Sequence, residues 1–197
     1  SSIIKIKNKK IFVDPGPQHY VGSGQAINIH GENFEVLGDY LTKKDVEFIK
    51  AGKELGVHKY MLSFLEKEND ILEILKIDPD AEIYGKIESL KGIEFIKNLK
   101  LPTNIKLIVA RDDLFTNTIL NKRLLFDVMK LIIKIDPNAI VASKILSSLE
   151  KNGDLSLSDL SDIYLLQKMG YKTFMLGDEL CFDPISLRKA LYILMSF

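Results

Sequence analysis

The sequence has little cysteine, no tryptophan, no net charge and no long apolar run. Its one cysteine, Cys181, cannot form a disulfide within the chain, which favours a reducing compartment such as the cytoplasm. Lysine plus arginine and aspartate plus glutamate are equal at 27 each, so we predict no nucleic-acid partner. No apolar run reaches the roughly 18 residues of a membrane span, and the start of the chain is too charged for a signal peptide. We therefore expect a cytoplasmic protein with no membrane partner.

The remaining composition is typical of a folded domain. Apolar residues make up 46% of the chain and charged residues 27%, which excludes disorder and collagen-like repeats. The first 40 residues are rich in glycine, with short strands expected at residues 3–6, 10–13 and 26–29. We predict a small β-rich N-terminal segment over residues 1–40 and a main domain over residues 41–197.

The main domain alternates short β-rich runs with amphipathic helical stretches. The expected strands are His58–Phe64, Glu82–Ile87, Lys106–Ala110, Ala139–Ala142 and Lys172–Leu176. The expected helices are Thr42–Gly56, Lys67–Leu75, Lys91–Leu99, Asn121–Ile135, Ser158–Met169 and Ile185–Met195. This alternation indicates parallel βαβ units, either in an open doubly wound sheet or in part of a (β/α)8 barrel. A full barrel typically needs about 250 residues, so this chain is too short for a normal one.

Charged residues stand where the expected strands end, which is where active sites of both architectures lie. Lys86 and Glu88 are two positions apart and so point to one face, and Asp113 follows the next strand. Two carboxylates suit Mg²⁺, and a lysine beside them can neutralise a transferring phosphoryl group. The pattern leaves open a second interpretation, in which these residues form an ion-pair ring that closes the end of the sheet.

Several motifs in this region resemble the pyruvate kinase family in order and spacing over residues 22–197. In chain order they are Gln25–Gly31, Leu41–Asp45, Leu62–Phe64, Ile83–Ile93, Leu107–Leu114, Ile140–Leu146 and Leu160–Ile163 followed by Met169–Leu176. Ile83–Ile93 resembles the family's signature around its catalytic lysine and first metal-binding glutamate. The resemblance implies an α/β fold, a partial (β/α)8 TIM barrel built from the family's strands four to eight. It implies that residues 1–40 are a remnant of the family's inserted B domain or of its first strand, and these alternatives stay open.

The resemblance also implies site residues. Lys86 would stabilise the transferring phosphoryl group, Glu88 and Asp113 would bind Mg²⁺, and Ser143 would contact substrate where the family has a threonine. The family usually uses K⁺ as well, but its ligands and a phosphate-binding arginine lie on strands without a counterpart here.

The chain departs from the family pattern at further positions near the substrate. Asp112 replaces a glycine before the metal-binding aspartate, where a carboxylate would repel the substrate unless paired with Arg111 or Lys144. Phe115 replaces the second glycine of this motif, and Lys144 replaces a glutamine. We expect these changes to weaken catalysis.

Three functional hypotheses follow from the resemblance. The chain is a reduced pyruvate kinase acting on phosphoenolpyruvate and ADP, or an inactive paralogue that binds a full-length pyruvate kinase, or a fragment of a longer chain. A sheet of five strands would leave two open edges and an apolar barrel-facing surface. We therefore expect a homo-oligomer or a hetero-oligomer with a full-length pyruvate kinase.

Overall fold

The computed structural model describes residues 2–8, 10–17, 22, 38–117 and 123–197, and the chain divides into two units, residues 1–36 and 37–197. In the first unit, β1 (Ser2–Lys7) pairs antiparallel with β2 (Lys10–Asp14). Asn8 adopts the left-handed conformation at φ 52°, which suits the tight turn of a hairpin. The strand predicted at residues 26–29 lies outside the described residues.

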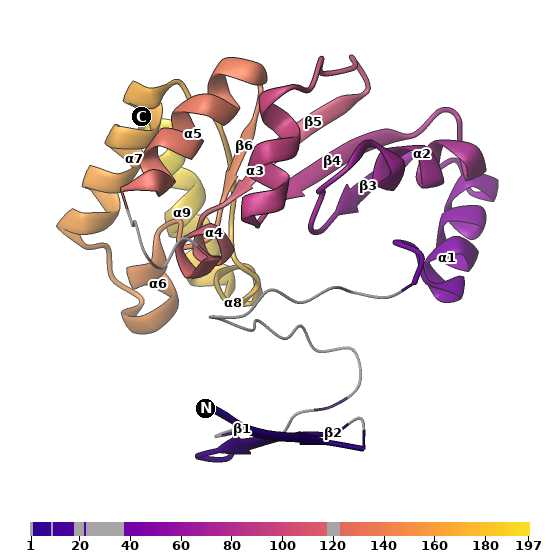
Figure 1. Ribbon diagram of the computed structural model, residues 1–197. Coiled ribbons are helices and arrows are strands. Elements are labelled where there is room, and N and C mark those ends of the chain that lie inside the picture. Colours follow the sequence, from indigo (N-terminus) through magenta and orange to yellow (C-terminus); the bar gives the residue numbers. More distant parts are fainter. Residues whose placement is uncertain (1, 9, 18–21, 23–37, 118–122) are drawn as a thin grey trace. The chain divides into compact units, whose positions relative to one another are not determined.

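The second unit is built on a parallel sheet of five strands in sequential order (Figure 1). The strands are β3 (Lys59–Leu62), β4 (Glu82–Ile87), β5 (Ile105–Ala110), β6 (Ile140–Ala142) and β7 (Thr173–Met175). Every neighbouring pair in this sheet is parallel. The predicted βαβ units are therefore confirmed, and the sequential order excludes the doubly wound alternative, in which the strand order reverses.

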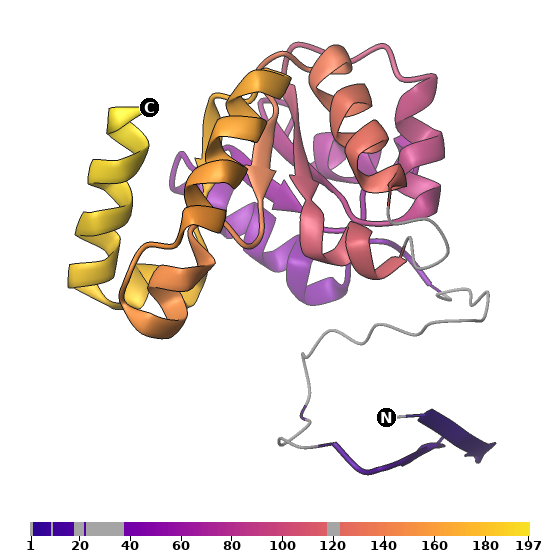
Figure 2. The same cartoon turned by 90° about the vertical axis from the view of Figure 1, so that its left-hand side faces the viewer.

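Six helices connect or flank these strands. They are α1 (Lys43–Glu54), α2 (Glu68–Ile77), α3 (Leu90–Lys97), α5 (Leu124–Ile135), α7 (Leu157–Met169) and α9 (Pro184–Ser196). Because crossovers between sequential parallel strands are right-handed, the four crossover helices α2, α3, α5 and α7 cover one face of the sheet (Figure 2). No helix of the described residues is long and apolar enough to cross a membrane.

Capping residues set the helix ends where the sequence predicts them. The Thr42 hydroxyl accepts a hydrogen bond from the Asp45 amide, and the Asp45 carboxylate accepts one in return from the Thr42 amide. Asp183 caps α9, with Pro184 as the first helical residue. Gly170 ends α7 in the left-handed conformation at φ 107°.

Three short helices were not predicted, and each directly follows or closely follows a strand. They are α4 (Arg111–Asn117), α6 (Ser147–Asn152) and α8 (Asp178–Phe182), and Figure 1 shows them gathered at one end of the sheet. Asp112 and Asp113 follow the strand that ends at Ala110, as expected, and both lie in the first turn of α4, which was not predicted. Acidic residues are favourable there because the helix dipole is positive at its N-terminus.

The two faces of the sheet differ in chemistry. The helix-facing side supplies the buried core, whose strand members include Ile83, Ile87, Leu107, Val109 and Val141. The opposite face is called here the open face. Its members by strand alternation are Lys59, Met61, Glu82, Tyr84, Lys86, Lys106, Ile108, Ala110, Ile140, Ala142, Thr173 and Met175. The expected apolar surface is therefore wrong for β3 and β4 and holds only for parts of β5 to β7.

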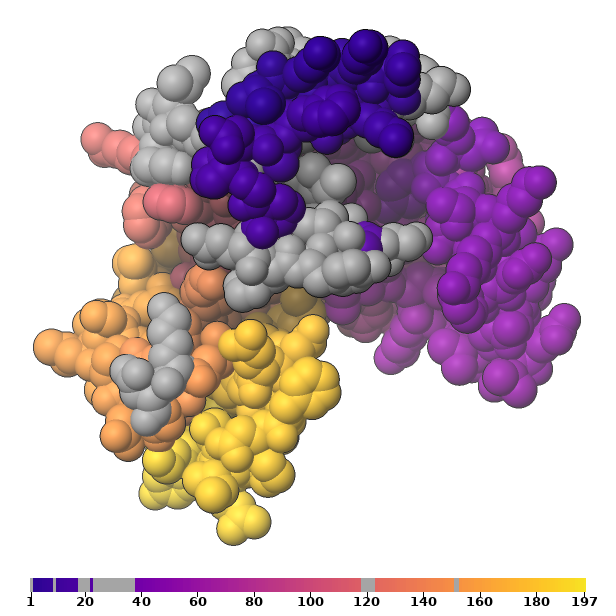
Figure 3. All heavy atoms as spheres, turned by 90° about the horizontal axis from the view of Figure 1, so that it is seen from below, coloured from indigo at the N-terminus to yellow at the C-terminus, as the bar shows by residue number. Residues whose placement is uncertain are grey.

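The described residues form no closed barrel, because β3 and β7 are the two edges of the sheet. The helices beside these edges, α1 and α9, lie far apart in both Figure 1 and Figure 3. The fold is thus an α/β fold with an open parallel sheet.

Candidate functional site

The centre of the candidate site is an ion pair at the carboxyl end of β4. Lys86 Nζ lies 2.5 Å from Glu88 Oε1. The Glu88 side chain is only 2% exposed and that of Lys86 is 21% exposed, so this pair is largely removed from water. The predicted proximity of these two side chains on one face is therefore observed.

The second carboxylate oxygen of Glu88 reaches the neighbouring strand end. Its Oε2 accepts a hydrogen bond of 2.6 Å from the Phe64 amide, directly beyond β3. Phe64 adopts the left-handed conformation at φ 51°, which is uncommon for a residue other than glycine. The Glu88 backbone carbonyl accepts a hydrogen bond of 2.7 Å from the Asn117 side chain of α4. Glu88 thus links the ends of β3 and β4 to α4.

The two aspartates of α4 directly follow β5, the strand next to β4 in the sheet. Ile87 of β4 pairs with Val109 of β5. Glu88, the residue after Ile87, therefore lies at the level of Ala110, the last residue of β5 before α4 begins. Asp113 is half-buried in the first turn of α4, and its carboxylate forms no ion pair with another described residue. Asp112 forms an ion pair with Lys144 across the ends of β5 and β6, with 3.2 Å between Oδ2 and Nζ.

Arg111 does not pair with Asp112 but clamps the loop after β6. Its Nη2 and Nε donate to the Ser143 carbonyl at 2.7 and 3.1 Å. Its Nη1 lies 2.7 Å from Asp162 Oδ1 on α7. Ser143 and Lys144 both adopt left-handed backbone conformations, at φ 73° and 57°. Such strained positions persist only where surrounding contacts hold them, and Arg111 supplies those contacts here.

Acidic groups surround the β3 side of the site. The Tyr40 hydroxyl donates to the Ser63 carbonyl, and its pKa is raised by burial and then by the nearby carboxylates of Asp70 and Glu88. Asp70 is 1% exposed, and burial raises its pKa even though it accepts hydrogen bonds from two backbone amides. Its Oδ1 has no hydrogen-bond partner among the described residues. This concentration of carboxylates favours a cation at the carboxyl ends of β3 and β4.

The donor set fits Mg²⁺ better than a metal enclosed by protein alone. Within the described residues, no group of three or more His, Cys, Asp or Glu side chains could hold a metal ion. Mg²⁺ commonly binds through one or two carboxylates and completes its octahedron with water and substrate phosphates. Glu88 lies just beyond β4, and Asp113 lies in the first turn of α4, a helix whose Asn117 side chain donates to the Glu88 carbonyl.

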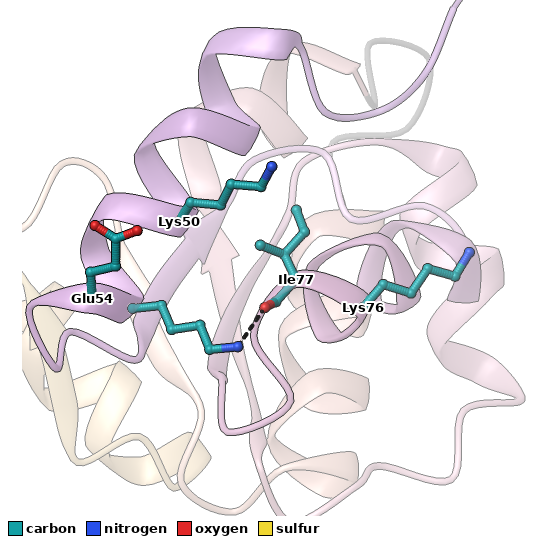
Figure 4. Close-up of a pocket in the computed structure, with 5 residues that line it drawn as sticks. Lys50, Glu54, Lys76 and Ile77 are labelled. Carbon is teal, nitrogen blue, oxygen red and sulfur yellow. Dashed lines mark hydrogen bonds between the residues drawn. The ribbon is translucent and has the colours of Figure 1, made fainter.

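A separate cavity of about 560 Å³ lies between α1 and α2 (Figure 4). It is lined by Lys50, Lys53, Glu54, Lys76 and Ile77, all near the C-termini of these two helices. Lys53 Nζ donates to the Ile77 carbonyl at 3.0 Å. Because both helices end just before a strand begins, the cavity is at the amino end of the sheet, away from Glu88. Its lysines are explained by the negative ends of two helix dipoles.

Sequence reasoning missed the Arg111 clamp and the contact from Asn117. Arg111 and Asp162 both stand in motifs of the family resemblance, so a signal for their importance existed, but nothing indicated that they meet. No sequence signal predicts the left-handed conformations of Ser143 and Lys144, since neither is glycine or asparagine.

These observations define the class of protein: an α/β fold whose sequential parallel strands end in a charged site. A family model described as the pyruvate kinase barrel domain matches residues 2–180. The chain belongs to the pyruvate kinase family.

Its similarity to curated relatives is low and covers most of this chain. It is 27% identical to pyruvate kinase from Lactobacillus delbrueckii subsp. bulgaricus over 169 residues, covering 81% of this chain and 28% of that protein. It is 27% identical to pyruvate kinase from Staphylococcus aureus (strain MRSA252) over 161 residues, covering 79% and 27% of the two chains. With pyruvate kinase from Candida albicans it shares 32% identity over 98 residues, 48% of this chain and 19% of the relative. The chain thus spans less than a third of the length of these relatives.

Proposed function

We propose that this chain takes part in phosphoryl transfer from phosphoenolpyruvate to ADP, giving pyruvate and ATP, as a reduced subunit of an oligomer. The observation that carries this proposal is the Lys86–Glu88 pair, buried at the carboxyl end of β4 and linked to α4. Family membership supports the same reaction. The larger unit is then a partial (β/α)8 barrel, which opens between β3 and β7.

Each proposed role follows from the position of its side chain. The Lys86 ammonium would neutralise the transferring phosphoryl group, because it is the cation nearest the carboxylate centre. The Ser143 hydroxyl would contact the substrate from a loop that Arg111 holds in place. Asp112 and Lys144 would lie at the substrate's carboxylate, where their ion pair cancels the repulsion of Asp112 alone.

Glu88 and Asp113 would hold the Mg²⁺ ion. When bound, Mg²⁺ supplies positive charge that neutralises the phosphate and carboxylate oxygens of the substrates. The short contact between Lys86 and Glu88 holds that carboxylate in a fixed orientation before the substrates arrive. A K⁺ requirement remains a prediction from the family resemblance, without assigned ligands in this chain.

The two open edges of the sheet, β3 and β7, support the oligomer part of the proposal. Phosphoryl transfer depends on several positive groups around the transferred phosphate, and the family's phosphate-binding arginine has no counterpart here. A second chain, either another copy or a full-length pyruvate kinase, would complete the site.

A coupled pyruvate-release assay tests the proposed reaction. The chain is assayed with phosphoenolpyruvate, ADP, Mg²⁺ and K⁺, alone and after mixing with a full-length pyruvate kinase whose own catalytic lysine has been replaced. We expect turnover that falls at least about 100-fold in Glu88→Gln, because such a substitution removes a charged group that acts on the transition state. Glu82→Gln is the matched control, since Glu82 also pairs with a lysine, Lys106 of β5, but lies at the amino end of β4. Equal loss in both variants, or no turnover under either condition, contradicts the proposal.

The Asp112–Lys144 pair favours a second candidate function, an inactive partner of a full-length pyruvate kinase. This pair occupies the proposed substrate position with side chains where the family has a glycine and a glutamine. The second candidate predicts no turnover that depends on Glu88, together with binding to a full-length pyruvate kinase that changes the partner's own rate. The same mixture, prepared with an active partner, distinguishes the two candidates.

A further inference from the structure

One peptide group joins Tyr40 to Glu88. The Tyr40 hydroxyl donates a hydrogen bond to the Ser63 carbonyl, and the Phe64 amide donates one of 2.6 Å to Glu88 Oε2. The Ser63 carbonyl and the Phe64 amide belong to the same planar peptide group, so the two hydrogen bonds hold its two ends. The orientation of this one plane therefore decides whether Glu88 meets a hydrogen-bond donor or a carbonyl oxygen.

The orientation that serves Glu88 is one that Phe64 by itself disfavours. Phe64 has φ 51°, in the left-handed region that a residue other than glycine rarely occupies. Turning the peptide plane over would move φ of Phe64 to negative values, as in the change from a type II to a type I turn. The turned plane would point the Ser63 carbonyl at the carboxylate, and these oxygens repel each other. The observed orientation therefore persists because contacts from outside hold it.

The residues on both sides of this peptide group are anchored independently of Tyr40. Leu62, the last residue of β3, is buried, and its strand pairs with β4. The Leu65 amide donates to the Lys86 carbonyl at 3.1 Å. The Leu65 side chain is completely buried against Gly85, so closely that a Cβ atom at that glycine would overlap it. The peptide plane lies between these fixed points, where it can turn without displacing either strand.

The Tyr40 hydroxyl is a fixed and permanent donor. Its ring packs against the buried core of the larger unit, and the next residue, Leu41, donates its amide to Glu73 of α2 at 3.1 Å. Burial and then the nearby carboxylates raise the pKa of Tyr40 above its ordinary value, so the hydroxyl keeps its proton at neutral pH. Because a donor that is already ordered loses little conformational entropy when it bonds, Tyr40 is suited to hold a strained peptide.

We propose that Tyr40 is a positioning residue of the candidate site: its hydroxyl keeps the Ser63–Phe64 peptide turned so that the N–H holds the Glu88 carboxylate for a divalent cation. This inference rests on the proposed function for the role of Glu88, and it adds the residue that sets the second oxygen of that carboxylate. Lys86 sets the first oxygen, at 2.5 Å. Outer partners that orient metal ligands typically raise metal affinity by about 10–100-fold.

Tyr40→Phe tests the proposal because it removes the hydroxyl and keeps the ring. The probe is Mn²⁺, which prefers the same oxygen ligands as Mg²⁺, and electron paramagnetic resonance measures its affinity for the whole chain. We expect Mn²⁺ to bind about tenfold more weakly in Tyr40→Phe. We also expect the Phe64 amide hydrogen to exchange at least about fivefold faster, as measured by NMR. Glu88→Gln identifies the part of Mn²⁺ binding that belongs to this site.

Tyr60→Phe is the matched control. Tyr60 lies on the same strand, β3, but its hydroxyl donates to the Val57 carbonyl at 2.8 Å and to Asp78 Oδ2 at 2.9 Å. This substitution also takes a tyrosine hydroxyl from a backbone carbonyl, so it reports the general cost to folding. Because distant sites act independently, we expect Mn²⁺ affinity and Phe64 exchange within about twofold of the unaltered chain. Circular dichroism confirms that each variant is folded.

Phe64→Gly tests the strain itself. Glycine adopts positive φ about as readily as negative φ, so its peptide plane no longer opposes the orientation that Tyr40 holds. We expect the effect of Tyr40→Phe on Mn²⁺ affinity to shrink from about tenfold to less than about threefold in the Phe64→Gly chain. A loss of the same size in both chains would overturn the strained peptide as the means by which Tyr40 acts.

The failure of this inference differs from the failure of the proposed function. Weaker Mn²⁺ binding and faster Phe64 exchange in Tyr40→Phe, with neither in Tyr60→Phe, support the inference. Mn²⁺ binding that depends on Glu88 but not on Tyr40 overturns it and leaves the proposed function intact. Unchanged Phe64 exchange in Tyr40→Phe, or equal losses in the two tyrosine variants, also overturns it. Mn²⁺ binding that is absent, or the same in Glu88→Gln, overturns the metal site and with it both proposals.

Discussion

The open face of the sheet carries two lysine–glutamate groups that differ in their surroundings. The group nearer the amino ends of the strands is called here the lower group. In it, Glu82 lies 2.8 Å from Lys106 Nζ and 3.6 Å from Lys59 Nζ, and it accepts a hydrogen bond of 2.7 Å from the Tyr84 hydroxyl. The group at the carboxyl ends of the strands is called the upper group. In it, Glu88 forms an ion pair with Lys86 and accepts a hydrogen bond from the Phe64 amide. The lower group lies within regular strands, whereas the upper group lies among loops and a short helix.

The difference between the two groups is one of exposure and of available charge. Glu82 is 28% exposed and has two lysines, so water and its own neighbours satisfy its charge. Glu88 is 2% exposed, and the half-buried Asp113 lies beyond it in α4. The comparison teaches that ion pairs on one sheet are not equivalent, because the lower group is shared with water whereas the upper group is buried at the strand ends.

The largest effect is expected when each glutamate loses its main lysine. Lys86→Met leaves the buried Glu88 carboxylate without a cation, so we expect a loss of about 2–4 kcal/mol in the free energy of unfolding. Lys106→Met leaves Glu82 with Lys59 and Tyr84, so we expect a loss of less than about 1 kcal/mol. Urea unfolding at neutral pH measures both values. Equal losses of unfolding free energy in the two variants would show that the lysines of the two groups contribute equally to stability.

The Arg111 clamp is expected to have the next largest effect. Arg111→Lys keeps the charge but cannot donate both to the Ser143 carbonyl and to Asp162, so we expect a loss of about 1–3 kcal/mol. Hydrogen exchange should increase at the amides of Ser143, Lys144 and Leu146, because their left-handed conformations lose support. Arg123→Lys is the matched control, since Arg123 is exposed. Unchanged exchange in this loop would contradict the clamp.

The Asp112–Lys144 pair should affect ligand affinity more than stability. Both side chains are more than half exposed, so their ion pair contributes little to folding. Asp112→Gly removes a carboxylate from the proposed substrate position and leaves Lys144 to attract the substrate. We expect phosphoenolpyruvate to bind about tenfold more tightly, which corresponds to about 1.4 kcal/mol. Isothermal titration measures this affinity, and weaker binding in Asp112→Gly would show that Asp112 is not a lesion.

The smallest effect is expected from the pH dependence of the lower group. Hydrogen bonds from Lys106 and Tyr84 lower the pKa of Glu82 from 4.5 to about 2. Because the folded pKa lies below the unfolded one, Glu82 contributes stability above pH 4.5, and this contribution is lost as the pH falls toward 2. Glu82→Gln should therefore lose less stability over this range than the unaltered chain. Thermal unfolding at several pH values measures the difference, and parallel curves would contradict it.

The sequence predicts the local features well because they depend on neighbouring residues. Hydrophobic periodicity correctly locates the main strands and helices of the larger unit, and the neighbouring residues Thr42 and Asp183 cap two of these helices. The proximity of Lys86 and Glu88 was predictable because strand alternation puts both on one face. The order of motifs predicts the family, which the family model confirms.

The features that the sequence does not determine depend on distances between elements. Arg111 pairs with Asp162, 51 residues away, and not with the adjacent Asp112. In this position its guanidinium contacts α7 and the loop after β6 at the same time. Lys144 forms an ion pair with Asp112 because β5 and β6 are neighbours in the sheet. The short helices α4, α6 and α8 and the polar open face of β4 likewise follow from how the strands pack. The sequence alone therefore determined the elements and the residues at their ends, and the tertiary structure decided which of those residues pair, since pairing depends on separations that only the folded sheet sets.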